Sequence, residues 1–253
     1  MVVSNKKVIK ILFGIPNEGN TDPFAYDNRM EMCFHLGALQ IMSHFGHKEY
    51  DNALFDIPRD TEYQFSTGTV GRVFTALARE RLADYAIDGG FDYLFMVDDD
   101  MLVPNDLFEK LIKHDVDIIA PLAFTRNAPH KPVIYNLEKG HDAIDGEYYI
   151  NHPVPYYPKD QLVQCDAVGF GAVLIKCDVL RKVPKNWFMS TSGAGEDIFF
   201  CHNAKKHGFK VYMDTSVKLT HMGYRKEITE ETYENENNIK LLREKYGTEQ
   251  KYR

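Results

Sequence analysis

The chain has 253 residues, of which 44% are hydrophobic and 26% charged, and its formal net charge is −7 at pH 7. This length suits one sizeable domain or two small ones, and the composition excludes disorder as the main state. The acidic balance argues against a protein that binds nucleic acid over a broad basic surface, because such binding depends on neutralising phosphates.

The N-terminal residues do not have the pattern of a secretory signal. The apolar run Val8–Ile15 is interrupted by Lys10 and ends at Pro16. No stretch approaches the roughly 20 apolar residues of a membrane-spanning helix. The cysteines are scattered, without the close pairs of a zinc site. We therefore expect a cytoplasmic protein with reduced thiols.

Strand and helix patterns alternate through the first half of the chain. We predict a buried strand over Val8–Ile15, a helix over Asp27–Phe45 and a second helix over Val70–Ile87. Both helices carry apolar residues at helical spacing. These residues are Met30, Phe34, Ile41 and Phe45 in the first helix, and Phe74, Ala78, Leu82 and Tyr85 in the second.

The second half continues this alternation. Further strands are predicted over Tyr93–Val97, Val116–Ala120, Ala172–Ile175 and Val211–Met213, with helices after Pro104 and from Glu196 or Asp197 to His207. Repeated strand–helix–strand order predicts an α/β fold with a mostly parallel central sheet and helices on both faces. Ligands of such sheets bind at the carboxyl ends of the strands.

Three consecutive aspartates directly follow the predicted strand Tyr93–Val97. On an extended backbone Asp98 and Asp100 point to the same side, so one carboxylate can reach a metal ion while the other reaches a ligand hydroxyl. The alternative is a solvated turn whose acidic residues cap the helix after Pro104. The position at the ligand edge of the sheet favours a functional site, because adjacent carboxylates repel unless a cation or donors intervene.

Three other patterns are weak when each is taken alone. Glu196 and Asp197 begin a predicted helix, where free N–H groups stabilise acidic residues, and a simple helix cap is the preferred interpretation. A lone histidine such as His221 is more often structural than a ligand. The segment Gly169–Gly171 fits an ordinary turn as well as a binding segment.

Taken in chain order, these patterns resemble the GT-A glycosyltransferases, in particular their inverting, family-2-like members. The matching stretches are Ala78–Leu82, Gly90–Met101, Asp166–Gly171, Trp187–Phe188 and Gly195–Cys201, followed by Asp214 and His221. An isolated Asp-x-Asp is poorly specific, but the ordered set covers most of the chain. The chain departs from the family at Glu80, where members often have Asn.

The resemblance implies a single GT-A domain over residues 1–224 and a C-terminal helical extension over residues 225–253. This extension would cover the acceptor site, packing on the same domain, or would pack on a partner subunit of a homo-oligomer. The implied activity is transfer of a sugar from a nucleotide-diphosphate donor, UDP favoured over GDP, to an acceptor hydroxyl with inversion. A divalent ion, Mn²⁺ or Mg²⁺, would neutralise the departing diphosphate.

The resemblance also assigns roles to individual residues. Asp197 would be the general base, kept ionised by the helix dipole, with Glu196 orienting the acceptor. Asp100 and His221, together with Asp98, would bind the metal. Donor contacts are expected from Pro16, Asn17, Glu18, Arg79, Asp98 and Asp99, and acceptor contacts from Gly169, Phe170, Gly171 and Trp187. For Arg79 a solvated arginine on a helix is an equally good interpretation.

Two other functions stay open: a nucleotidyltransferase acting on a sugar phosphate, and a nucleotide-sugar-binding protein without turnover. Gly14–Gly19 contains no Lys, which disfavours the phosphate loop of the first. The acceptor is equally open between a glycan, a lipid-linked group, a protein and a modified nucleic-acid base. Arg126, His130 and Lys131 would give it a local basic face, or are scattered surface charges.

Overall fold

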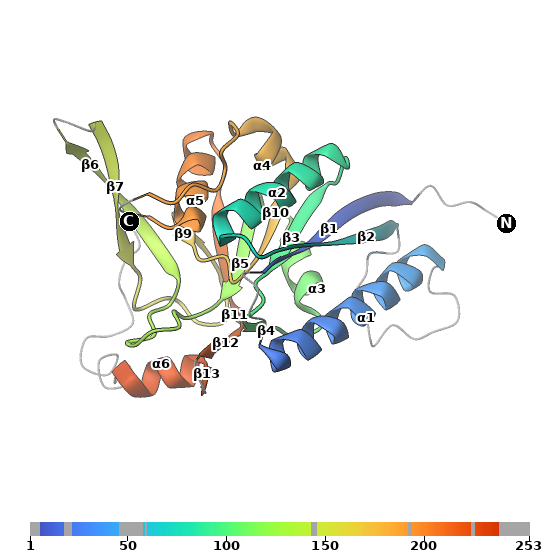
Figure 1. The fold of residues 1–253 in the computed structure, drawn as a ribbon, viewed down its shortest axis with the longest axis horizontal. Helices are drawn as coiled ribbons and strands as arrows, with labels where there is room; N and C mark the ends of the chain where they lie inside the picture. Colours follow the sequence, from blue (N-terminus) through green and yellow to red (C-terminus); the bar gives the residue numbers. More distant parts are fainter. Residues whose placement is uncertain are drawn as a thin grey trace.

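A seven-stranded central sheet organises the molecule, in the order β2-β1-β3-β10-β5-β11-β8 (Figure 1). The computed structural model describes residues 6–17, 22–45, 58, 60–142, 146–191, 194–223 and 226–237. The strands are β1 Lys7–Asn17, β2 Thr61–Gly71, β3 Tyr93–Val97, β5 Ile118–Leu122, β8 Leu162–Cys165, β10 Ala172–Lys176 and β11 Val211–Lys218. β2, β1, β3, β5 and β11 share one direction, whereas β10 and β8 run opposite to it. The predicted α/β fold with a mostly parallel sheet is confirmed.

Helices cover both faces of this sheet (Figure 1). α2 Thr75–Asp88, α4 Cys177–Lys182 and α5 Glu196–Lys206 lie on one face, and α1 Pro23–Phe45 and α3 Leu107–Ile112 on the other. A hydrophobic core lies on each face of the sheet, and alternate residues of β3 pack into one core and the other. Leu94 and Met96 pack with α2, while Phe95 and Val97 pack with α1 and α3. β3 is thus apolar throughout because it is covered on both sides.

The apolar residues whose spacing predicts the first helix lie on its exposed side. Phe34 and Phe45 are 74% and 78% exposed, whereas Met32, Leu36 and Leu39 are buried against the sheet. The reason is that α1 is apolar on two opposite faces. Periodicity alone cannot decide between such faces, and the longer aliphatic stripe packs on the sheet.

The second predicted helix is shorter than expected at its start. Val70 belongs to β2, the chain turns at Arg72 with a φ of 60°, and α2 begins only at Thr75. Phe74 is 86% exposed, whereas Leu82 is buried as predicted. The strand β2 was not predicted, because its sequence TEYQFSTGTVG mixes polar and small residues on both faces.

The strand predicted over Val116–Ala120 lies two residues further on, and Pro121 stands inside β5 instead of ending it. Pro121 lies opposite Asp214, where the pairing of β5 with β11 shifts register. A missing N–H is tolerated at such an irregularity.

Two small sheets extend the domain. β4 Met101–Leu102, β12 Thr220–Gly223 and β13 Lys226–Ile228 form one, and β6 Ile134–Asp142, β7 Gly146–Pro153 and β9 Ala167–Val168 form the other. In the first, His221 lies opposite Met101, the residue that follows the three aspartates. The hairpin of β6 and β7, which projects from one end of the molecule in Figure 1, was not predicted.

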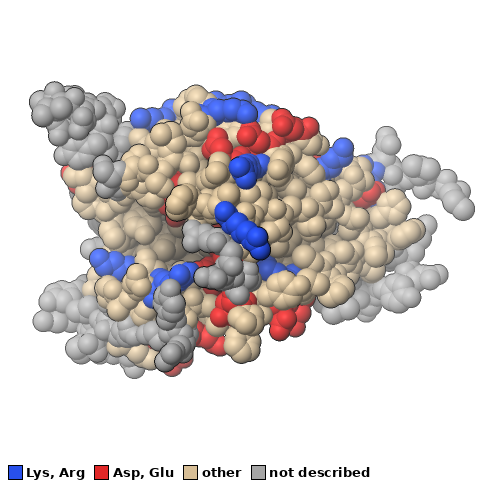
Figure 2. Space-filling model, in the orientation of Figure 1, with Lys and Arg blue, Asp and Glu red and all other residues tan. Residues whose placement is uncertain are grey.

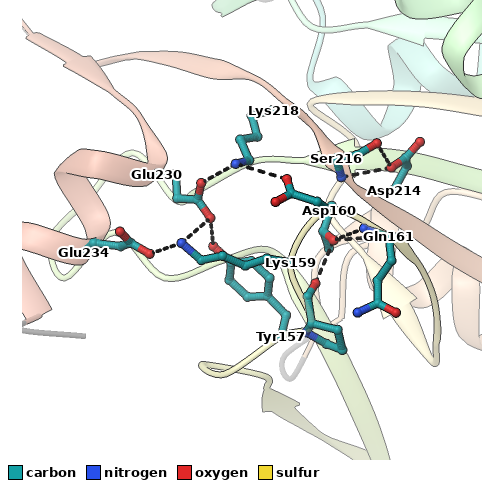
Figure 3. A network of polar contacts seen from close by, with 11 residues as sticks. Tyr157, Lys159, Asp160, Gln161, Asp214, Ser216, Lys218, Glu230 and Glu234 are labelled. Carbon is teal, nitrogen blue, oxygen red and sulfur yellow. Dashed lines mark hydrogen bonds and ion pairs between the residues drawn. The ribbon is translucent and has the colours of Figure 1, made fainter. Parts of the chain in front are cut away.

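The last described helix, α6 Glu230–Asn237, lies within the extension expected over residues 225–253. Its Tyr233 is 1% exposed and stacks on Phe124 with ring centroids 5.0 Å apart. Figure 3 shows the polar contacts of the same helix, with Glu230 of α6 between Lys159 and Lys218. These residues of the extension therefore pack on the domain itself. Among the described residues, no helix is long and apolar enough to cross a membrane.

Candidate active site

A cleft of about 460 Å³ opens at the carboxyl ends of β1, β3 and β5, the edge at which the sequence predicts a ligand. Most of the predicted site residues line it. They are Pro16, Arg79, Asp98, Asp99, Asp100, Gly169, Phe170, Gly171, Glu196, Asp197 and His221. On the face shown in Figure 2, acidic and basic side chains are interspersed and form no broad basic patch.

Two other predicted residues, Trp187 and Asn17, are not among the described residues that line the cleft. Trp187 is 2% exposed, lies in the core and donates its indole N–H to the Val183 carbonyl. Asn17 ends β1, and its carbonyl accepts the N–H of Arg72. Glu18 lies outside the described residues. Asp214, part of the resemblance, is 1% exposed and bonds His114 at 2.8 Å, with its backbone in β11.

One half of the cleft, which we call the inner half, is built around Arg79. This side chain is 3% exposed. Its Nη2 donates to both oxygens of Asp98 at 2.8 Å and to the Phe170 carbonyl at 3.0 Å, and its Nη1 donates to Glu196. Arg79 is therefore not a solvated arginine on a helix surface, and both of its terminal nitrogens already bond protein groups. One guanidinium instead joins the end of β3, the glycine segment and the start of α5.

The charges of the inner half depend on one another. Burial would lower the pKa of Arg79, but the carboxylates of Asp98 and Glu196 outweigh it and raise this pKa above its ordinary value. Burial raises the pKa of Asp98 to about 6, against the opposing charge of Arg79. The cation of Arg79 thus partly offsets the cost of burying the acidic residues around it.

Asp197 is the innermost carboxylate at the start of α5. Its Oδ1 accepts the backbone N–H of Ile198 at 2.7 Å. Burial raises its pKa above the ordinary value, the charge of Arg79 opposes this shift, and the neighbouring Glu196 adds to it. The N–H of Ile198 at the start of α5 stabilises the ionised form, but desolvation has the larger influence on this pKa. A carboxyl group with a raised pKa is a stronger base once it is ionised.

The outer half of the cleft contains Asp100, His221 and Arg126. The Nδ1 of His221 lies 2.8 Å from the Phe124 carbonyl, which can only accept, so Nδ1 carries the proton. Its Nε2 lies 3.0 Å from Oδ2 of Asp100. Burial lowers the pKa of His221 below its ordinary value. Arg126 donates to the same Asp100 oxygen, so this carboxylate lies between an imidazole and a guanidinium.

These residues fit a divalent ion whose shell is completed by a ligand. Bonds of about 2.1 Å at right angles separate two donors by roughly 3 Å, the spacing of Asp100 and His221. Within the described part of the chain, no group of three or more His, Cys, Asp or Glu side chains is arranged to hold a metal alone. Asp98, predicted as a third ligand, has both oxygens on Arg79. Donor phosphates and water would have to supply the remaining ligands.

The glycine segment lines the cleft with its backbone. A Cβ at Gly169 would lie 2.7 Å from the Cβ of Val133, so this position requires glycine for close packing, whereas a Cβ at Gly171 would lie 3.1 Å from the flexible end of Met101. Phe170 is 1% exposed, and its ring packs on Phe188 and Phe200 in the core. Its contribution to the cleft is the carbonyl that accepts from Arg79.

Two further residues of the cleft lie outside the set to which the sequence assigns a role. Arg126 was considered either as part of a basic face for the acceptor or as a scattered surface charge, and Tyr135 is the second residue of the unpredicted strand β6. Burial, together with the negative charge of Asp197, raises the pKa of Tyr135 to about 12. Its phenol therefore stays protonated and lies within the electrostatic reach of Asp197. No local pattern marks this residue, since its position depends on the pairing of β6 with β9.

No family model and no curated protein sequence matches the chain. The fold is similar to that of A197 from STIV, with a TM-score of 0.50 and 18% identity over 87% of this chain and 94% of that chain. Lower scores relate it to GalNAc-T7 with UDP, GalNAc and Mn²⁺ (0.43, 10% identity, 86% of this chain, 43% of that chain). Apo-UDP-glucose pyrophosphorylase also has a lower TM-score of 0.41, with 10% identity over 94% of this chain and 99% of that chain. The shared fold therefore rests on the comparison with A197.

Proposed function

We propose that the chain is a glycosyltransferase that moves a sugar from a nucleoside-diphosphate donor, preferably a UDP-sugar, to an acceptor hydroxyl. The observation that carries this proposal is that one cleft is lined by a partly buried carboxylate with a raised pKa, Asp197, and by Asp100 and His221, whose spacing fits a divalent ion. Sugar transfer needs these two elements, a base for the acceptor and a positive charge for the leaving diphosphate.

Asp197 is the proposed base. It would take the proton of the acceptor hydroxyl as that oxygen attacks the anomeric carbon, and the sugar–phosphate bond would break on the opposite side. A single base next to the cleft supports one displacement with inversion. Glu196 would orient the acceptor with the Oε1 that Arg79 holds, and Tyr135 would position the same hydroxyl.

Asp100 and His221 are the proposed metal ligands, and bound Mn²⁺ or Mg²⁺ would neutralise charge on the leaving diphosphate. Arg126, which is 43% exposed, would turn from Asp100 to the diphosphate when the donor binds. Pro16 and Asp99, which line the cleft, would contact the base and ribose from the ends of β1 and β3. Asp98, which Arg79 holds in place, would accept a hydrogen bond from a hydroxyl group of the nucleotide sugar.

The acceptor side is proposed at the backbone of Gly169 and Gly171. Trp187 would support this side indirectly, since the neighbouring Phe188 packs on Phe170. Residues 1–224 would form the catalytic domain and residues 225–253 its extension. The class of acceptor is left open by the cleft, which offers both a carboxylate pair and the cation of Arg126.

The test is to incubate the chain with Mn²⁺ and a panel of nucleotide sugars and to follow the phosphorus species by ³¹P NMR. A glycosyltransferase releases the nucleoside diphosphate, slowly to water and faster when a suitable acceptor is present. A nucleotidyltransferase would instead exchange pyrophosphate, and a binding protein would shift the donor resonances without consuming it. Release of UDP that Asp197→Asn abolishes supports the proposal; pyrophosphate exchange or unchanged donor would refute it.

A further inference from the structure

The C-terminal helix α6 reaches the candidate metal site through one aromatic contact. Tyr233 of α6 stacks on Phe124 with an interplanar angle of 27°, and both rings are 1% exposed. The carbonyl of Phe124 accepts the Nδ1–H of His221 at 2.8 Å. A chain of contacts therefore runs from α6 to Nδ1 of His221, the ring whose other nitrogen faces Asp100.

The far side of Tyr233 is held as well. Its hydroxyl donates to the Pro155 carbonyl at 2.8 Å. The same helix is tied to the domain through Glu230, which bonds Lys218 at 2.7 Å and accepts the Tyr157 hydroxyl at 2.7 Å (Figure 3). Lys159 pairs with Glu230 and Glu234. These contacts hold the ring of Tyr233 in place independently of its stacking on Phe124.

A second connection runs through the backbone. β13 leads directly into α6, and its Ile228, which is fully buried, lies opposite His221 in β12. The other neighbour of β12 is β4, where Met101 lies opposite His221. The histidine is therefore held between the segment that follows the aspartates and the segment that precedes α6.

We propose that Tyr233 is a positioning residue for the metal site. By holding Phe124, it keeps that carbonyl on Nδ1 of His221 and leaves Nε2 as the lone pair that faces Asp100. Groups behind a ligating histidine fix its tautomer and ring orientation in this way, and their loss weakens metal binding by about 10- to 100-fold. This inference rests on the metal site of the proposed function and makes α6 part of that site.

The experiment compares Mn²⁺ affinity in the wild type, Tyr233→Ala and Tyr233→Phe, measured from the EPR signal of free Mn²⁺ with UDP present. Tyr233→Phe is the matched control, because it keeps the stacked ring and loses only the bond to Pro155. We expect Tyr233→Ala to bind Mn²⁺ about tenfold more weakly and Tyr233→Phe within about twofold of the wild type. Equal affinity of all three proteins would overturn the inference alone, whereas a wild type that binds no Mn²⁺ would overturn the metal site as well.

Two readouts separate positioning from a loss of folding. The imidazole ¹⁵N resonances of His221 report the tautomer, and we expect the Nδ1–H form in the wild type and a mixture in Tyr233→Ala. In the wild type, Mn²⁺ with UDP should slow hydrogen exchange in residues 230–237, because coupling between two sites is reciprocal. An unchanged tautomer in the variant, or unchanged exchange of α6 when Mn²⁺ binds, would contradict a positioning role.

Discussion

The two halves of the cleft hold carboxylates only two residues apart in very different surroundings. In the inner half, Asp98 is bound on both oxygens by Arg79, a cation that is itself 3% exposed. In the outer half, Asp100 faces the imidazole of His221 and a half-exposed arginine. The inner half is therefore already neutralised by the protein, whereas the outer half relies on a cation that a ligand can replace.

This difference separates scaffold from binding site. A buried charge that loses its partner is costly, so the inner residues must keep one arrangement whether or not a ligand is present. Exposed ion pairs contribute little to stability and rearrange easily. We expect substitutions in the inner half to change the free energy of unfolding, and substitutions in the outer half to change ligand binding.

Loss of the inner cation should have the largest effect. Arg79→Met leaves the partly buried Asp98 and Glu196 without their partner, and breaking such a pair costs up to about 3–5 kcal/mol. Denaturant unfolding measures this loss. The matched control is Arg81→Met on the exposed side of the same helix, which should change stability by less than about 0.5 kcal/mol. Equal effects of the two variants would contradict the scaffold role of the inner half.

Removal of the proposed base should have the second-largest effect. Asp197→Asn keeps the size of the side chain and cannot accept a proton, so turnover should fall about 100-fold or more. Initial rates of UDP release measure it. Asp178→Asn, on the exposed start of α4, is the control and should leave the rate unchanged. Turnover of Asp197→Asn within a few-fold of the wild type would remove Asp197 from the mechanism.

The same residue predicts a pH dependence. The folded pKa of Asp197 is raised, so the stability associated with its protonated form is present below the ordinary pKa of 3.8 and is lost as pH rises through the folded pKa. Asp197→Asn should therefore unfold at a higher temperature than the wild type at pH 8, and this advantage should disappear near pH 4. The rate of the wild type should fall with acid at a pH above the ordinary carboxylate range. Parallel melting curves at the two pH values would contradict the buried carboxylate.

The smallest effect on stability is expected in the outer half. Arg126→Ala removes an exposed pair with Asp100, so the free energy of unfolding should change by less than about 1 kcal/mol. Affinity for UDP with Mn²⁺ should nevertheless fall several-fold, because a charged contact to the diphosphate is lost. Calorimetric titration measures this affinity. If Arg126→Ala lost as much stability as Arg79→Met, the proposed difference between the two halves would be contradicted.

The sequence predicts the ligand edge of this fold well, and the reason is local. The apolar run Tyr93–Val97 is buried on both faces and leads straight into Asp98, so strand and site are visible in one window. The helix start at Glu196 is similarly local. The strands β2, β6 and β7 carry mixed polar and apolar residues, and no window distinguishes them from loops.

The parts of the site that the sequence does not predict depend on distant contacts. Arg79 and Glu196 are 117 residues apart along the chain, and His221 and Asp100 are 121 apart. Only the folded chain shows that Arg79 is committed to Asp98 and Glu196. The buried face of α1 is not predictable from the sequence for the same kind of reason, since packing on the sheet decides between two apolar faces.

The central claim is that Asp100 and His221 hold a divalent ion that binds the donor diphosphate. The most direct measurement is the melting temperature of the wild type and of Asp100→Ala with UDP, with Mn²⁺ and with both. We predict that UDP and Mn²⁺ together stabilise the wild type by several degrees more than either alone, and that Asp100→Ala loses this increment. An increment of equal size in Asp100→Ala, or none in the wild type, would contradict the account.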